Sequence, residues 1–83
     1  MDEALTALRE AILTLLDQRE PGKSICPSEA ARLAFPENWR SYMKRTRDAA
    51  IQLAETNAIE ICQGGNPVEN FQFKGPIRLR KPS

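Results

Sequence analysis

The sequence predicts a mostly α-helical domain that ends in a small β-hairpin, arranged as a winged helix-turn-helix with three helices and a C-terminal wing. Apolar residues recur at helical spacing in three segments before residue 57, and beyond it they alternate with polar residues as in β-strands. A short extended piece over residues 23–26 separates the first two helices. This order is typical of the winged helix-turn-helix, although a three-helix domain with an unrelated β-hairpin would give the same pattern.

The first expected helix covers about four turns close to the N-terminus. Acidic residues at positions 2 and 3 stand where they complement the positive end of the helix dipole. The sequence Glu20-Pro21-Gly22-Lys23 ends the helix, because proline cannot continue it and glycine permits the turn. The apolar stripe that faces the core consists of Leu5, Leu8, Ile12 and Leu15, with Leu16 beside them.

The second helix is expected from Pro27 to about Phe35, where the proline at position 36 ends it. Cys26, Pro27 and Glu29 fit the template of a capping box, with the cysteine as N-cap and the proline at the first helical position. A thiol accepts hydrogen bonds more weakly than a hydroxyl. More of the capping therefore falls to Glu29, or to Ser28 if the boundary shifts by one residue.

Cys26 has other interpretations that the sequence leaves open. The start of a helix lowers the pKa of a thiol, which would suit a redox or nucleophilic cysteine. The chain contains no histidine to act as its base, so a capping or core role is favoured. A disulfide with Cys62 is possible on the count of two cysteines but is not expected in a cytoplasmic protein. Cys62 itself is expected to be a half-buried apolar residue.

The third helix is expected over residues 39–55. Asn38 is a suitable N-cap, and Asn57 can take the left-handed conformation that ends a helix. Trp39 starts the inward face and is expected to anchor the core rather than to stack on the bases of a single strand. Arg40 and Arg47 share one flank of the helix. The outward face consists of Ser41, Lys44, Arg45, Asp48 and Gln52.

The C-terminal third is expected to form the hairpin. Residues 58–63 alternate between apolar and polar side chains and predict a strand, and residues 64–67 predict a turn. Residues 71–73 and 77–80 alternate again. Gly75-Pro76 interrupts them, which is typical of an edge strand or a bulge.

Composition excludes several classes of protein. No apolar run is long enough to span a bilayer, and the acidic start lacks the features of a signal peptide, so a cytoplasmic protein is expected. One domain is expected over residues 1–83, with frayed ends at 1–3 and 81–83. Without histidine, a cluster of metal ligands or a phosphate loop, the sequence predicts neither an enzyme nor a bound metal or cofactor.

The net charge of +1 conceals an asymmetry between the two halves. Residues 1–37 carry 4 basic and 7 acidic side chains, whereas residues 38–83 carry 8 basic and 4 acidic ones. Such a division indicates a negatively charged partner on one side of the molecule. Two solvated faces without a partner are the alternative.

Duplex DNA is the expected partner, bound by the third helix in the major groove and by phosphate contacts from the last strand, as in a small transcription-associated protein. Ser41 would direct its N–H toward a phosphate. A protein-interaction module of the same fold is the alternative. The pI of 7.8 favours it, as does the wing tip over residues 64–70, which carries Glu69 and no lysine or arginine. The candidate nucleic-acid-binding residues are Arg40, Ser41, Lys44, Arg45, Arg47, Gln52, Lys74, Arg78 and Arg80.

The sequence resembles a small bacterial family of unknown function that has a predicted winged-helix fold. Its members share the motifs R-G-x-(S/T)-x-C-P-S-E-x-A-R, W-R-x-x-M, A-x-x-L-A and G-P-(I/Y)-R-(I/L). The resemblance covers residues 9–80 and departs only where Glu20-Pro21-Gly22 replaces the usual Arg-Gly turn. It implies the fold but no activity. The matching positions are Cys26, Pro27, Ser28, Glu29, Ala31, Arg32, Trp39, Arg40, Met43, Ala50, Leu53, Ala54, Gly75, Pro76, Ile77 and Arg78.

The shared motifs also imply that their charged residues act as a unit. We expect Glu29 and Arg32 to form a structural ion cluster with Arg40, Arg47 and Arg78, between the second helix, the third helix and the last strand. The cluster would either lock the wing onto the helices or hold an anion, and the lock is favoured. For Arg47, a structural ion pair and a nucleic-acid contact are equally expected.

Overall fold

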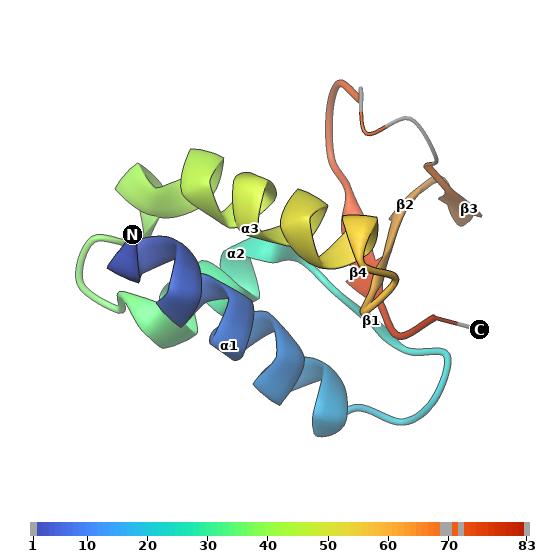
Figure 1. The fold of residues 1–83 in the computed structure, drawn as a ribbon, viewed down its shortest axis with the longest axis horizontal. Coiled ribbons are helices and arrows are strands. Elements are labelled where there is room, and N and C mark those ends of the chain that lie inside the picture. Colours follow the sequence, from blue (N-terminus) through green and yellow to red (C-terminus); the bar gives the residue numbers. More distant parts are fainter. Residues whose placement is uncertain (1, 69–70, 72, 83) are drawn as a thin grey trace.

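The computed structural model describes residues 2–68, 71 and 73–82 (Figure 1). In this described part, three α-helices precede most of a small antiparallel sheet. None of these helices is long and apolar enough to cross a membrane. In chain order the elements are α1 (Glu3–Asp17), β1 (Ser24–Ile25), α2 (Pro27–Ala34), the 3₁₀ helix η1 (Trp39–Tyr42), α3 (Met43–Glu55), β2 (Glu60–Gln63), β3 (Asn66–Pro67) and β4 (Arg78–Arg80).

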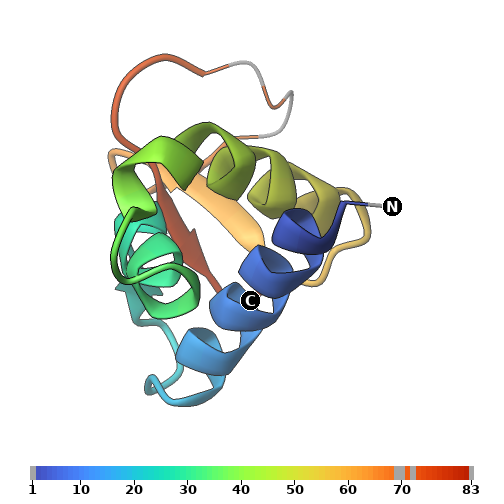
Figure 2. The same cartoon turned by 90° about the vertical axis from the view of Figure 1, so that its left-hand side faces the viewer.

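The three helices pack against one another and against one face of the sheet. Figure 2 looks along the helical layer and shows α1, α2 and α3 on three sides, with the sheet behind them. The core lies where the helices meet the sheet. Thr46 is its one buried polar side chain in the described part of the chain, and its hydroxyl donates to the Tyr42 carbonyl at 2.8 Å. The largest fully buried apolar side chains are Leu8, Ile12, Leu16, Ile25, Ile61 and Leu79.

The sheet has the strand order β1-β4-β2-β3, and the three pairs are antiparallel. The short β1 therefore joins the sheet beside the last strand, far away in sequence. Leu79 of β4 stands opposite Ile25 of β1 and Ile61 of β2. Side chains that face one another across strands in this way interact directly, so these three apolar residues form one row in the core.

The apolar stripe predicted for the first helix is confirmed. Asp2 is the N-cap, and its carboxylate accepts from the N–H groups of Ala4 and Leu5 at 3.0 and 3.3 Å. The helix ends at Asp17, three residues before the predicted stop signal. Gly22 adopts a φ of 85°, as expected for the turn that follows. Of the ends predicted to fray, Met1 and Ser83 lie outside the described residues.

The helix predicted over residues 39–55 has two parts. Its first turn is the 3₁₀ helix η1, and the α-helix begins only at Met43. Asn38 is the N-cap of η1, at the predicted position, but it makes no side-chain capping hydrogen bond within the described residues, and the N-cap of α3 itself is Tyr42. The Asn38 carbonyl instead accepts from both the N–H and the hydroxyl of Ser41, at 3.1 and 2.8 Å, which closes the tighter turn. The left-handed conformation predicted for Asn57 is confirmed by its φ of 63°.

The hairpin is tighter than predicted. Gly64 and Gly65 both have positive φ, at 57° and 83°, so they alone make the turn and β3 begins directly at Asn66. Phe71 has a φ of 56° and Phe73 lies outside the strands, so the strand predicted over 71–73 is wrong for these two residues. Gln72, like residues 69–70 of the predicted wing tip, lies outside the described residues.

Candidate functional site

The start of α2 is built as the sequence predicts, with Glu29 as the main capping group. Its carboxylate accepts from the Cys26 N–H at 2.8 Å and forms an ion pair with Arg19 at 2.5 Å. The predicted grouping of Glu29 with Arg32 is therefore wrong. Arg19 reaches Glu29 because the turn after α1 returns the chain to the first turn of α2, a long-range contact that spacing along one helix does not reveal.

Both cysteines are free thiols. Cys26 accepts a hydrogen bond from the Ser28 hydroxyl at 3.1 Å. Cys62 is only 3% exposed, and burial raises the pKa of its thiol, while the positive charge of Arg80 opposes the rise. The neutral, protonated thiol is the form in which Cys62 packs beside β4. The position agrees with an apolar role for this residue.

We expect Cys26 to be alkylated much faster than Cys62 in the folded protein. Cys26 is partly exposed at a helix start, whereas Cys62 is buried and protonated at neutral pH. Mass spectrometry after timed exposure to iodoacetamide measures both rates, and the same reaction in denaturant is the control that should make them similar. Equal rates in the folded state would contradict the burial of Cys62.

Trp39 is the meeting point of two arginines from different elements. The Arg32 guanidinium of α2 lies over the indole at 4.3 Å from the ring centroid, and that of Arg40 at 4.7 Å. Trp39 also packs against the hydrophobic core, which agrees with the anchor role predicted for it. Arg32 thus belongs with Trp39 and Arg40 rather than with Glu29.

The connection between α2 and α3 is fixed by aromatic rings. Phe35, just after α2, stacks on Tyr42 of η1 with ring centroids 3.8 Å apart and an interplanar angle of 6°. The Arg45 guanidinium lies over the Tyr42 ring at 5.6 Å from its centroid, and it pairs with Asp2, the N-cap of α1, at 3.6 Å. These contacts hold the start of α3 against both preceding helices.

Two of the side chains predicted to face outward from α3 are exposed, as predicted, and also contact α1 or its N-cap. Arg45 pairs with Asp2, and the Gln52 amide oxygen accepts a hydrogen bond from Arg9. Arg45 and Gln52 are seven residues apart and therefore lie on the same flank of the helix. Ser41 was predicted to direct its N–H toward a phosphate, but this N–H donates to the Asn38 carbonyl.

Arg47 lies on the opposite flank of α3, beside the segment that leads into β4. Its Nη2 donates to the Gly75 carbonyl at 3.1 Å, and its guanidinium lies over Phe73 at 5.9 Å from the ring centroid. Arg47 therefore ties this segment to α3 through a carbonyl and a ring, which differs from the ion pair weighed for it. One edge of the Arg47 guanidinium group is therefore bound to the protein itself.

The arginines of β4 are held within the sheet. Arg78 donates to the Ser24 hydroxyl and carbonyl, both at 3.0 Å, which fastens β1 to β4. Arg80 pairs with Glu60 of β2 at 2.8 Å, and this hydrogen bond raises the pKa of its guanidinium. The single cluster predicted for Glu29, Arg32, Arg40, Arg47 and Arg78 is therefore wrong. Arg32 and Arg40 meet over Trp39, whereas Glu29, Arg47 and Arg78 take part in three other contacts.

Five other basic side chains lie on α2, η1, α3 and the segment before β4, and we call this group the basic strip. It runs from α2 across η1 and along the Arg47 flank of α3 to the segment before β4. Across the described residues, the ion pairs join Arg19, Arg45, Arg80 and Lys81 to carboxylates, and no member of the strip is in one of them. The strip consists of Arg32, Arg40, Lys44, Arg47 and Lys74; Arg47 is half-buried and the others are exposed.

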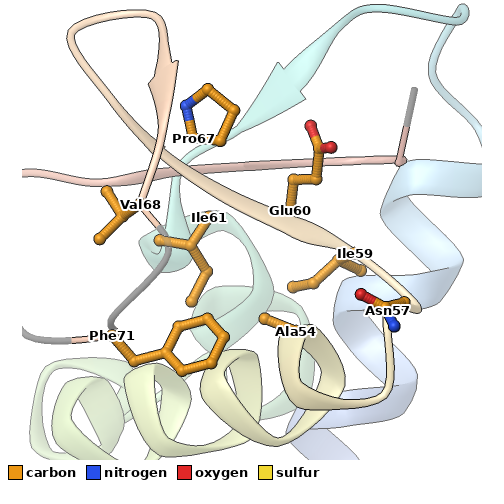
Figure 3. Close-up of a pocket in the computed structure, with 8 residues that line it drawn as sticks. All are labelled: Ala54, Asn57, Ile59, Glu60, Ile61, Pro67, Val68 and Phe71. Carbon is orange, nitrogen blue, oxygen red and sulfur yellow. The ribbon is translucent and has the colours of Figure 1, made fainter.

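A hollow of about 340 Å³ lies between the end of α3, β2 and Phe71 (Figure 3). Six of its eight lining residues are apolar, and the Glu60 carboxylate in the lining is paired with Arg80. In the described part of the chain, no group of three His, Cys, Asp or Glu residues is placed to hold a metal ion.

Comparison with known families gives a match over most of the chain. The model of a family described as a protein of unknown function, DUF3253, matches residues 6–82. The chain belongs to the DUF3253 family. The resemblance to a small family of unknown function is thereby confirmed, and the match covers all the elements from α1 to β4 except the first residues of α1. No curated protein matches the chain. Membership in DUF3253 supplies no activity, so function has to be argued from the surface.

Proposed function

We propose that this DUF3253 domain is a winged helix-turn-helix that binds duplex nucleic acid, with DNA as the expected duplex, through the basic strip. The element order and the pairing of β1 with β4 support the fold assignment. In this assignment α2 and α3 form the helix-turn-helix, α3 is the recognition helix, and the segment between β2 and β4 is the wing.

The observation that carries the proposal is the uneven pairing of the charges. Arg19, Arg45, Arg80 and Lys81 have carboxylate partners, while the five basic side chains of the strip have none among the described residues. Arg9 and Arg78 also lack a carboxylate partner there but donate hydrogen bonds to other side chains, which leaves Lys23 as a further exposed cation outside the strip. Unpaired cations gathered on one face are suited to a polyanion, because phosphates replace condensed counterions there. The net charge of +1 then understates the local potential of this face.

The basic strip also includes residues of both elements that would contact a duplex in the proposed fold, the recognition helix and the wing. Lys44 is exposed on α3, and Lys74 adjoins Gly75, which Arg47 ties to the same helix. A recognition helix and a wing that are bound to each other can follow the phosphates on both sides of one groove. The contact through Arg47 keeps these two surfaces in register.

A protein partner is the second candidate, supported by the acidic residues on the exposed face of α3. Asp48 and Glu55 are exposed and lie seven residues apart, on the same side of the helix as Lys44. A face of mixed sign suits a protein surface with complementary charges more than a uniform polyanion. The two candidates differ in how strongly binding depends on salt.

We expect the domain to bind random-sequence duplex DNA with an affinity that falls steeply with salt. Three to five phosphate contacts give a slope of about −3 to −4.5 in a plot of log affinity against log salt concentration. Fluorescence polarisation of a labelled 20-base-pair duplex between 25 and 200 mM salt, roughly the range in which such slopes are resolved, measures it.

The matched control is a single-stranded oligonucleotide of the same length. Since the strip follows a helix and a wing, a duplex should bind more tightly than the single strand. Absence of duplex binding at tens of micromolar protein and 25 mM salt, about the most favourable condition for phosphate contacts, would overturn the nucleic-acid proposal and leave the protein partner.

A further inference from the structure

Two positively charged groups are held against one indole at the start of the basic strip. Arg32 and Arg40 lie 4.3 and 4.7 Å from the centroid of Trp39. Their guanidinium carbons are thus no more than about 9 Å apart. At low ionic strength, where the Debye length reaches about 30 Å, the two like charges repel each other. The contact with the indole offsets part of that repulsion.

The charges around this pair leave the positive potential largely uncompensated. Glu37 is the nearby carboxylate, since it lines a shallow hollow of about 240 Å³ together with Trp39 and Arg40. It is exposed and forms no ion pair with either arginine in the described structure. A phosphate contacted by both guanidiniums would reduce this repulsion.

We propose that Arg32 and Arg40, held over Trp39, form a clamp for one phosphate group of a nucleic-acid backbone. This inference rests on the proposed function and names a specific contact within it. Guanidinium groups offer paired N–H donors that match phosphate oxygens. The indole restricts their motion, which lowers the entropic cost of fixing them on a ligand.

The same geometry argues against base stacking on Trp39. A base would need an open face of the indole, and the two guanidiniums lie over the ring while its remainder packs on the core. Ser41 borders the hollow but its hydroxyl donates to the Asn38 carbonyl, so it has no hydrogen left for a phosphate oxygen. The two arginines are therefore the donors of the clamp.

Trp39 is the only tryptophan of the chain and reports directly on the clamp. Its emission is followed while the wild-type protein is titrated with an unlabelled 20-base-pair duplex, roughly two helical turns, or with inorganic phosphate. We expect the duplex to change the emission at concentrations at which inorganic phosphate has no effect, because the backbone adds the other strip contacts.

Three variants test the two arginines themselves. We expect Arg32→Gln and Arg40→Gln each to weaken duplex binding about tenfold at 50 mM salt, and the double variant to reduce the salt slope by about 1.8. Glu37→Gln should tighten binding about twofold, since it removes a surface charge that repels the phosphate. The matched control is Lys23→Gln, an exposed cation in the turn after α1, which should leave the salt slope unchanged.

Lysine at both positions separates charge from structure. Arg32→Lys with Arg40→Lys should restore the salt slope but not the full affinity, because lysine keeps the charge and lacks the planar fork. Thermal melting by circular dichroism shows whether each variant is folded. A duplex affinity and salt slope unchanged in folded Arg32→Gln/Arg40→Gln would overturn the clamp and leave the proposed function standing.

The other outcomes are equally decisive. If the wild-type protein binds no duplex, the proposed function fails and the clamp fails with it. If inorganic phosphate changes the Trp39 emission and the duplex does not, the site takes a small phosphate and the assignment to a nucleic-acid backbone is overturned.

Discussion

Replacing Leu79 with alanine is expected to lower the free energy of unfolding by about 2–5 kcal/mol, the range for a buried leucine that leaves a cavity. Leu79 is fully buried and stands between Ile25 and Ile61 in the central row of the sheet. A domain of this length has a total stability of only about 4–12 kcal/mol, so a large share of it depends on this side chain.

Leu33→Ala is the matched control, because it makes the same chemical change at an exposed position. Leu33 lies on α2 with 51% of its surface exposed, and we expect a change within about 0.5 kcal/mol, partly offset by the higher helix propensity of alanine. Urea denaturation followed by circular dichroism measures both variants. Equal losses of stability at the two positions would contradict the register of β4 between β1 and β2.

The helices and their inward faces could be predicted because they follow from local periodicity. The stripe of Leu8, Ile12 and Leu16 repeats at helical spacing, and these three side chains are buried in the structure. The start of α2 was equally readable, because Glu29 and Pro27 form a local signal within four residues of Cys26. Such signals depend on neighbours in the chain and need no knowledge of the tertiary structure.

The partners of the charged residues could not be predicted, because they depend on contacts between distant segments. Arg9 and Gln52 are 43 positions apart, and Arg78 reaches Ser24 across 54. Helical periodicity placed Gln52 on the outer surface of α3 but could not show that α1 approaches that flank. The details of the hairpin could not be predicted either, since two glycines with positive φ shorten the turn and β3 begins already at Asn66.

This difference changes which candidate residues matter for binding. Of the nine residues predicted to contact nucleic acid, Arg45, Gln52, Arg78 and Arg80 have side chains that contact other groups of the same molecule. Lys44 and Lys74 are exposed and belong to the basic strip. Arg32 was expected to serve a structural ion cluster, and its position over Trp39 makes it the unexpected member of the strip.

Reversing two charges of the basic strip is expected to have the largest effect on binding. Lys44→Glu with Lys74→Glu places a negative charge on α3 and another beside the wing segment, outside the proposed phosphate clamp. We expect duplex affinity at 50 mM salt to fall by at least about 100-fold, since two phosphate contacts are lost and two repulsions are introduced. The salt slope should fall with it, as measured by fluorescence polarisation.

The control changes the net charge by the same amount at another part of the surface. Lys23→Glu with Lys81→Glu replaces the same residue type twice, in the turn after α1 and at the end of the described chain. In Figure 1 this turn and the C-terminal end lie at the opposite end of the molecule from η1. Lys81 pairs with Asp17 at the surface, so its loss should cost no more than about 1 kcal/mol of stability.

The comparison of the two double variants separates position from total charge. Each starts from a net charge of +1 and gains two glutamates for two lysines, so any effect of overall charge on association is common to both. A loss confined to Lys44→Glu/Lys74→Glu places the duplex on the strip, and the control should lose less than about threefold. Equal losses would mean that attraction to the duplex is nonspecific, and an unchanged affinity in both would remove α3 and the wing segment from the interface.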